Sequence, residues 1–199
     1  METSYIVTFV GDDRPGLVEQ LSSVIESNQG NWLESRLSQL GGKFAGLILV
    51  TLPTASGATL ESELKALSAS GLSVRVTPSS KLEHTAHGTS SRGITLTIIG
   101  PDRLGIVREI SRALAARQIN VIEMDSDVSS APMSAEMIFR SRIDAEIPEH
   151  FDLDELQDSL DEIANNMTLE IDLEPASHWG SIAIQACRAT ICANRSSTG

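Results

Sequence analysis

Apolar and polar residues follow two different periods along this chain, and the period changes repeatedly between residues 4 and 174. Short β-branched runs, YIVTFV at 5–10 and ITLTII at 94–99, are typical of strands buried on both faces. After each run, apolar residues recur at helical spacing. These predicted helical stripes are Leu17, Val18, Leu21, Val24 and Ile25, and Ile106, Val107, Ile110, Ala113 and Leu114.

The remaining elements follow in the same order in both halves. WLESRLSQL (32–40) and FAGLILVTLP (44–53), separated by Gly41-Gly42, predict a hairpin. VIEMDSDV and AEMIFRSRI, around residues 129–132, predict its counterpart. Further helices and closing strands complete the pattern. They are the helix with Leu60, Leu64 and Leu67, the strand LSVRVTP, the helix with Leu153, Leu156, Leu160 and Ile163, and the strand MTLEIDLE.

The two halves are copies of one unit. A shift of 89 positions aligns Tyr5–Asn31 with Ile94–Asn120 without a gap, and nine of those 27 positions are identical. Average composition would give about two identities. A duplicated unit is therefore the simplest explanation.

Each copy has the order β-α-β-β-α-β, which predicts an α+β chain of two ferredoxin-like units with antiparallel sheets. The predicted divisions are a first domain at 4–78, a linker at 79–92, a second domain at 93–174 and a tail at 175–199 whose origin the sequence leaves open. Each unit would leave sheet edges unpaired, so we expect the two units to pair within the chain. A homodimer is also left open.

Composition limits the possible functions. The net charge is −12, from 27 acidic and 15 basic residues, which disfavours direct binding to nucleic acid. No apolar run approaches the roughly 20 residues that cross a bilayer, so no membrane association is expected. The N-terminus lacks the basic region of a signal peptide, and the two cysteines, Cys187 and Cys192, lie near the end of the chain. These features predict a cytoplasmic protein.

Motifs of enzymes are missing from the sequence. No nucleophile elbow, Walker loop or dinucleotide fingerprint is present. His84 and His87 form an H-x-x-H pair in the predicted linker, with too few further ligands to indicate a zinc site. We therefore predict no catalytic residues, no metal and no cofactor.

The most distinctive feature is a loop that occurs in both copies, GDDRPGL at 11–17 and GPDRLGI at 100–106. One explanation is structural: Asp13 and Asp102 cap the following helices, while Gly16 and Gly105 allow close approach to the neighbouring strand. The other is a binding site. A helix N-terminus attracts a carboxylate, and a neighbouring aspartate attracts an ammonium group, so together they suit an α-amino acid.

Asn31 and Asn120 are identical in the two copies and follow the first helix of each. Their side-chain amides could contribute to the same amino-acid site. Alternatively, each terminates its helix in the left-handed conformation that asparagine tolerates.

The loops, the two asparagines and the repeated element order resemble the ACT domain, a small regulatory module that commonly binds amino acids at domain interfaces. The segment DDRPGLVEQLSSVIESNQGNWLESRLSQLGGKF is more narrowly similar to the first domain of the glycine cleavage system transcriptional repressor family. That family has tandem ACT domains and is thought to act on a DNA-binding activator. The resemblance covers about residues 4–174.

The resemblance implies a non-enzymatic, amino-acid-sensing regulator of transcription, with glycine or serine as ligand and a DNA-binding activator as partner. The alternative is a separate ACT regulatory subunit that binds an amino acid and modulates a metabolic enzyme. Either way, the expected ligand-binding residues are those of the two loops and the two asparagines: Asp13, Arg14, Gly16, Leu17 and Asn31, with Asp102, Arg103, Gly105, Ile106 and Asn120.

Overall fold

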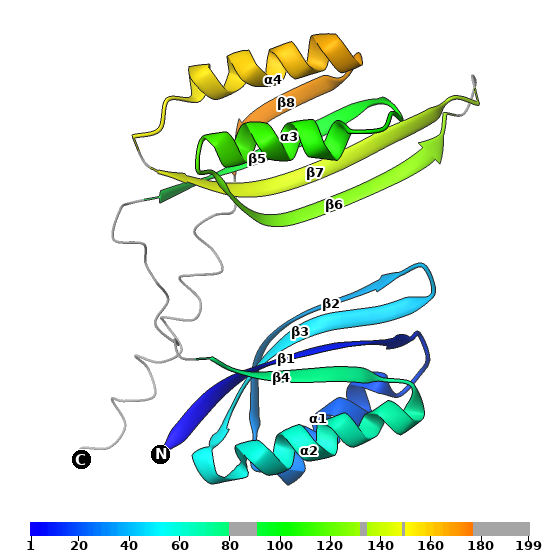
Figure 1. Ribbon diagram of the computed structural model, residues 1–199, viewed down its shortest axis with the longest axis vertical. Helices are drawn as coiled ribbons and strands as arrows, with labels where there is room; N and C mark the ends of the chain where they lie inside the picture. Colours follow the sequence, from blue (N-terminus) through cyan, green and yellow to red (C-terminus); the bar gives the residue numbers. More distant parts are fainter. Residues whose placement is uncertain (80–90, 132–134, 149, 177–199) are drawn as a thin grey trace, which may run out of the picture. The chain divides into compact units, whose positions relative to one another are not determined.

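The computed structural model describes residues 1–79, 91–131, 135–148 and 150–176. The chain forms two compact units, each described here by itself (Figure 1). Both have four antiparallel strands and two main helices in the order β-α-β-β-α-β, which confirms the predicted fold class.

In the first unit the sheet order is β2-β3-β1-β4. Short 3-10 turns, η1 and η2, flank its second helix. The elements are β1 (Glu2–Asp12), α1 (Leu17–Ser27), β2 (Asn31–Leu40), β3 (Lys43–Pro53), η1 (Thr54–Ser56), α2 (Gly57–Ala66), η2 (Leu67–Ser70) and β4 (Ser73–Ser79).

The second unit repeats this arrangement with the sheet order β6-β7-β5-β8. Its hairpin strands are slightly longer than those of the first unit. The elements are β5 (Ser91–Pro101), α3 (Ile106–Ala116), β6 (Asn120–Ser130), β7 (Met137–Pro148), α4 (Leu153–Met167) and β8 (Glu170–Pro175).

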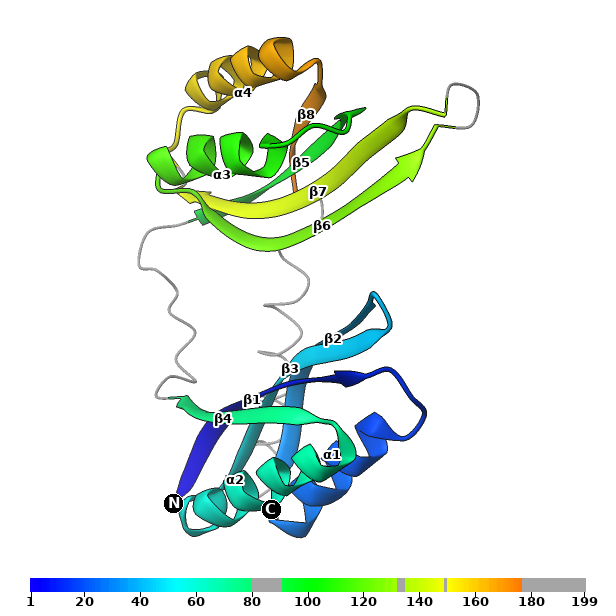
Figure 2. The same ribbon diagram turned by 45° about the vertical axis from the view of Figure 1, so that its right-hand side comes forward.

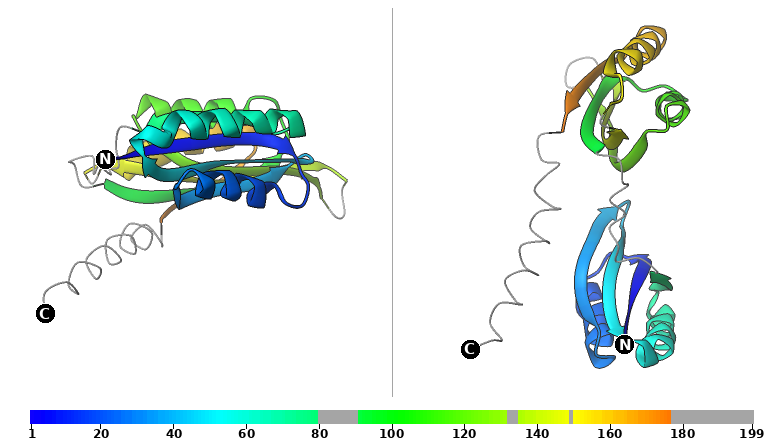
Figure 3. Two further views of the ribbon diagram at one scale, coloured as in Figure 1. Left: turned by 90° about the horizontal axis from the view of Figure 1, so that it is seen from below. Right: turned by 90° about the vertical axis from the view of Figure 1, so that its left-hand side faces the viewer.

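Both helices of a unit cover the same face of its sheet, as Figure 2 shows for α1 with α2 and for α3 with α4. In the view from below, α1 and α2 lie in front of the first unit's strands (Figure 3, left). The core lies between helices and sheet. Leu21, Ile48 and Leu60 are fully buried in the first unit, as are Leu96, Leu156 and Leu160 in the second. Val18 and Val107, which the helical stripes assigned to the core, are about two-fifths exposed.

The other face of each sheet carries no helix, and we call it the open face. In β1, Val7 and Phe9 are buried, whereas Ile6 before them and Val10 after them are 37% and 45% exposed. The prediction that YIVTFV is buried on both faces is therefore wrong for the unit by itself. The helices cover only one side, so alternate apolar residues of this run lie on the open face.

The structure contains the hairpin turn that the sequence predicts at Gly41-Gly42. Gly41 and Gly42 join β2 to β3 with φ of 57° and 76°, the two positive values that a tight hairpin of this type requires. Both second strands also carry the same irregularity, a register shift between Trp32 and Glu34 in β2 and between Val121 and Glu123 in β6.

The predicted linker and tail fall largely outside the described residues, as do His84, His87, Cys187 and Cys192. Of the residues assigned to the linker, Ser79 ends β4, and Ser91 and Arg92 begin β5. No helix in the described part of the chain is long and apolar enough to cross a membrane.

Candidate functional site

The loop between β1 and α1 is exposed and held from two sides. The amide of Asp13 donates to the carbonyl of Gly42 at 3.0 Å, and Gln39 Nε2 donates to Asp13 Oδ2 at 2.8 Å. On the other side, Arg14 Nη2 donates to the carbonyl of Ser70 at 3.1 Å. The hairpin therefore holds Asp13, while Arg14 extends toward η2.

Neither aspartate caps its helix, contrary to the structural explanation suggested by the sequence. Gly16 and Gly105 are the N-cap residues, with φ of 90° and 97°, and no side-chain cap hydrogen bond is present at either helix. The Asp13 carboxylate instead accepts from Gln39, as described above. Asp13 and Asp102 each lie three positions before the N-cap glycine of the following helix.

The two glycines are required by backbone conformation rather than by close packing. A Cβ built on Gly16 has no atom within 4 Å, and one on Gly105 meets only the end of Arg108 at 3.9 Å. The expectation of close approach to the neighbouring strand is therefore wrong. Left-handed φ is what glycine permits at this position.

Leu17 and Ile106 anchor the helix beginnings in the core. Their side chains are only 3% and 2% exposed, and each packs in the hydrophobic cluster of its own unit. Only their main-chain atoms could therefore contact a ligand. The first amides of α1 and α3 have no partner within the helix, which makes these helix beginnings donors for an anion.

In the second unit the loop borders a cavity of about 520 Å³. Four of the expected residues line it, namely Asp102, Arg103, Gly105 and Ile106. The wall also contains five residues that were not among the expected ligand-binding residues: Leu104, Val107, Arg108, Val128 and Phe139. Cationic, anionic and apolar groups thus surround one cavity of a size typical of small-molecule sites.

Val128 and Phe139 were missed because they lie far from the loop in sequence. They are opposite each other in the register of β6 and β7. Only this strand pairing brings them beside the loop, at the end of the sheet where the backbone amide of Asp102 donates to the carbonyl of Met137 at 2.8 Å. Leu104 replaces Pro15 of the first copy and is fully exposed.

The two asparagines do not join the loops within a unit. Asn31 pairs with Thr51, which pairs with Ser4, whereas the loop follows Asp12 at the other end of β1. The eight residue-to-residue steps from Ser4 to Asp12 correspond to about 27 Å of strand. Asn120 stands in the same relation to its loop, because it is level with Gly93 and the loop follows Pro101.

The asparagines also do not supply the left-handed residues. Gln29 and Gln118 have φ of 59° and 57°, while Asn31 and Asn120 are the first residues of β2 and β6. Their proposed role as left-handed helix terminators is therefore wrong. The backbone N–H of Gln29 donates to the carbonyl of Glu26, and that of Gln118 donates to the carbonyl of Ala115, each in the preceding helix.

Beside the first loop lies one ion pair that shifts a pKa. Lys43 donates a hydrogen bond to Asp12 beside the first loop, and this bond, with the positive charge of Lys43, lowers the pKa of the Asp12 carboxyl. Within the described ranges, no three His, Cys, Asp or Glu side chains come together as a metal site.

Comparison with known proteins identifies both units. Residues 3–77 and 94–165 each match the ACT domain family. A UPF0237 protein from Methanosarcina mazei and one from Methanosarcina acetivorans are each 36% identical to this chain over 87 residues. The matched segment covers 87% of each relative and 43% of this chain.

Two solved structures share the tandem arrangement over most of their length. An unknown protein from Galdieria sulphuraria is 27% identical with a TM-score of 0.77, covering 88% of this chain and 99% of that one. A protein provisionally described as a glycine cleavage system transcriptional repressor is 20% identical with a TM-score of 0.65, covering 87% and 97%. At that identity the likeness concerns the fold.

Proposed function

Because the chain belongs to the ACT domain family and carries two such domains in tandem, we propose that it is a non-enzymatic regulatory protein that senses a small amino acid. The observation that carries this proposal is the repeated loop. In both units an aspartate and an arginine precede a glycine N-cap in the left-handed conformation.

Each part of the loop has a matching part in an α-amino acid. The first helix amides and the arginine suit the carboxylate, and the aspartate suits the ammonium group. The binding residues that we propose are Asp13, Arg14, Gly16 and Leu17 in the first unit and Asp102, Arg103, Gly105 and Ile106 in the second. Leu17 and Ile106 contribute through their main chain, since their side chains are buried.

The ligand that we propose is glycine or serine, which the resemblance to the repressor family suggests. Asn31 and Asn120 are excluded from a site within one unit by their distance from the loops. They would reach a bound amino acid only at a loop of another ACT unit, in the same chain or in a homodimer.

The proposed action is cytoplasmic and runs through a protein partner, a DNA-binding activator of transcription. The net charge of −12 supports this arrangement, because an acidic protein is repelled by DNA but attracted to the basic surface of a DNA-binding protein. The amino acid would act by having different affinities for the free and partner-bound protein.

Ligand binding is tested by thermal unfolding of the full chain with each common amino acid in turn. A ligand at 100 times its dissociation constant stabilises the folded state by about 2.7 kcal/mol, which a melting curve detects. Glycine or serine is expected to raise the melting temperature. A screen in which no amino acid does so would contradict the sensing role.

The partner is tested separately, by purification of the protein from its native host with and without the amino acid. A transcription factor whose recovery changes with the amino acid is the expected result. Recovery of a metabolic enzyme instead would identify the chain as a regulatory subunit of that enzyme. Sequence-specific retardation of DNA by the isolated protein in a low-salt gel shift would contradict action through a partner.

A further inference from the structure

The open faces of the two units carry different side chains although the strands beneath them pair in the same order. Three central positions on each of the four strands correspond one to one through the registers. In the first unit, five of these twelve positions are apolar: Ile6, Val10, Ala45, Leu47 and Leu49. Their counterparts in the second unit are Thr95, Ile99, Arg140, Arg142 and Asp144. The fold therefore does not require apolar side chains at these positions.

The five apolar side chains of the first open face adjoin one another, and we call them the apolar patch. Ile6 is opposite Leu49 and Val10 is opposite Ala45 in the register of β1 and β3, with Leu47 between these pairs. Directly opposite residues on one face of a sheet bring their Cβ atoms within about 5.5 Å. Leu47 is 51% exposed, and a groove of about 300 Å³ is lined by Leu47, Ile6 and Leu49 together with polar neighbours. A contiguous apolar surface of this kind is typical of an interface.

The charged groups of the first open face lie outside the apolar patch. Its twelve positions hold one carboxylate, Glu34, and two guanidinium groups, Arg36 and Arg75, a net charge of +1. All three residues belong to the edge strands β2 and β4, whereas the patch lies on the inner strands β1 and β3. Covering the patch therefore does not remove an ionised group from water.

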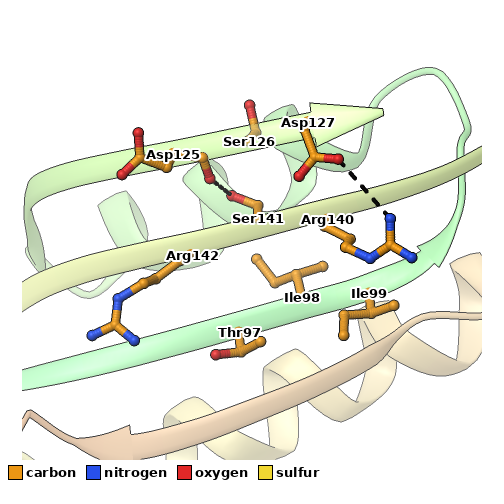
Figure 4. A pocket seen from close by; sticks show the side chains of 9 residues that line it. All are labelled: Thr97, Ile98, Ile99, Asp125, Ser126, Asp127, Arg140, Ser141 and Arg142. Carbon is orange, nitrogen blue, oxygen red and sulfur yellow. Dashed lines mark hydrogen bonds and ion pairs between the residues drawn. The ribbon is translucent and has the colours of Figure 1, made fainter. Parts of the chain in front are cut away.

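The open face of the second unit has the opposite character. Its twelve positions hold seven carboxylates and two guanidinium groups, a net charge of −5. Charged side chains occupy an inner strand as well as the edge: Figure 4 shows Arg140 and Arg142 on β7 and Asp125 and Asp127 on β6. Covering these groups with aliphatic side chains would take them out of water, which is costly. Two copies of this face would repel each other. It is therefore poorly suited to cover an apolar surface or to pair with itself.

We propose that the chain forms a symmetric homodimer in which the apolar patches of two copies pack face to face. A second copy is the partner that these observations favour, because it brings a surface that is equally apolar and has no charge at its centre. Two packed sheets lie about 10 Å apart with their side chains interdigitated, so Leu47 of each copy can enter the groove of the other. This contact does not depend on amino-acid binding at either loop.

The size of the face sets the strength of such a dimer. Four strands about 4.8 Å apart, each with about seven residues at about 3.4 Å per residue, give a face of about 450 Å². Two such faces together bury about 900 Å², close to the lower limit of about 1,000 Å² for a specific interface. We therefore expect a dimer that dissociates on dilution rather than a permanent one.

The first test measures the molecular mass of the full chain over a range of concentrations by sedimentation equilibrium. We expect the mass to rise from that of one chain, 21.3 kDa, toward twice that value as the protein is concentrated. The dimer should persist or strengthen at high salt, because salt screens the repulsion between two chains of net charge −12. A chain that stays monomeric at every concentration, or a dimer that dissociates at high salt, would overturn the proposal.

The second test locates the contact by backbone amide NMR of the full chain. On dilution, we expect the amides of residues 6–10 and 45–49 to shift, while those of the equivalent residues 95–99 and 140–144 stay unchanged. Shifts confined to the second unit, or to the outer edge strand β2, would place the interface elsewhere and contradict the proposal.

Matched substitutions at equivalent positions separate the two open faces. Val10→Arg places a charge in the apolar patch and is expected to weaken dimerisation by more than about tenfold. Ile99→Arg makes the same change at the equivalent position of the second unit, where the side chain is similarly exposed, and should leave dimerisation unchanged. Equal losses in the two variants would mean that the apolar patch is not the interface.

Leu47→Arg gives an independent check. Arg142 occupies the equivalent position in the second unit, so the fold accommodates an arginine there. The substitution is expected to abolish the rise in mass with concentration, and thermal unfolding verifies that each variant is folded. A Leu47→Arg variant that dimerises like the wild type would exclude the apolar patch from the contact.

Discussion

Gln39 Nε2 lies 2.8 Å from Asp13 Oδ2, so the β2–β3 hairpin holds the carboxylate that we expect to receive a ligand's ammonium group. The contact fixes the loop without a helix cap. It also means that a ligand must share Asp13 with the glutamine amide or displace it.

We predict that Asp13→Asn weakens amino-acid binding at the first loop about tenfold, because a charged hydrogen bond is lost. Gln39→Ala should retain at least the wild-type affinity, since it frees the carboxylate that the ligand needs. Isothermal titration calorimetry of the two variants with the same amino acid checks this. A larger loss in Gln39→Ala than in Asp13→Asn would show that the glutamine, rather than the aspartate, contacts the ligand.

The glycine N-cap allows a prediction about stability. Gly16→Ala should lower the free energy of unfolding by about 1 kcal/mol, because alanine is strained at a φ of 90° although space for its Cβ is open. Gly16→Asn is the matched control and should cost less, since asparagine tolerates left-handed backbone better. Urea unfolding measures both. An alanine variant as stable as the wild type would show that the loop adopts another conformation.

The core of the first unit gives a second stability prediction. Leu21→Ala should lower the free energy of unfolding by about 2–5 kcal/mol, because the side chain is fully buried and leaves a cavity. Val18→Ala, on the same helix but 41% exposed, should cost much less. Denaturant titration compares the two. Similar losses would place Val18 in an interface that the isolated unit does not contain.

Asp12 and Lys43 give a prediction about pH. Lys43→Met should raise the pKa of Asp12 toward its ordinary value, because the hydrogen bond and the positive charge of Lys43 both lower that pKa in the wild type. A lowered pKa means that the interaction is present above the ordinary carboxyl pKa and is lost as the pH falls. Side-chain NMR titration measures the shift. An unchanged pKa would show that the pair does not form in solution.

The Asn31 side chain should not affect binding at the Asp13 loop of its own unit. Asn31→Ala is expected to leave the affinity of the Asp13 loop for the amino acid unchanged in the monomer, because about 27 Å of strand separates Asn31 from that loop. Titration at a protein concentration where the chain is monomeric checks this. A loss of affinity that appears only where the protein self-associates would assign Asn31 to the site of a neighbouring molecule.

Much of the fold could be predicted from the sequence because its signals are local. The 89-residue repeat, the β-α-β-β-α-β order and the Gly41-Gly42 turn depend on hydrophobic period and on backbone conformations that few residues adopt. The candidate loops were also found in this way, since a helix begins directly after Gly16 and after Gly105.

The arrangement around the loops was decided only by tertiary structure. An apolar run such as YIVTFV does not reveal which side is covered, and the helices leave Ile6 and Val10 on the open face. The first helix runs back along the sheet, so Asn31 begins β2 far from Asp13 although both follow β1 in sequence. Strand pairing likewise brings Val128 and Phe139 from separate strands to the cavity at the Asp102 loop. Such placements depend on register and on the direction in which the chain returns, and these are fixed by packing of the whole unit rather than by any local pattern.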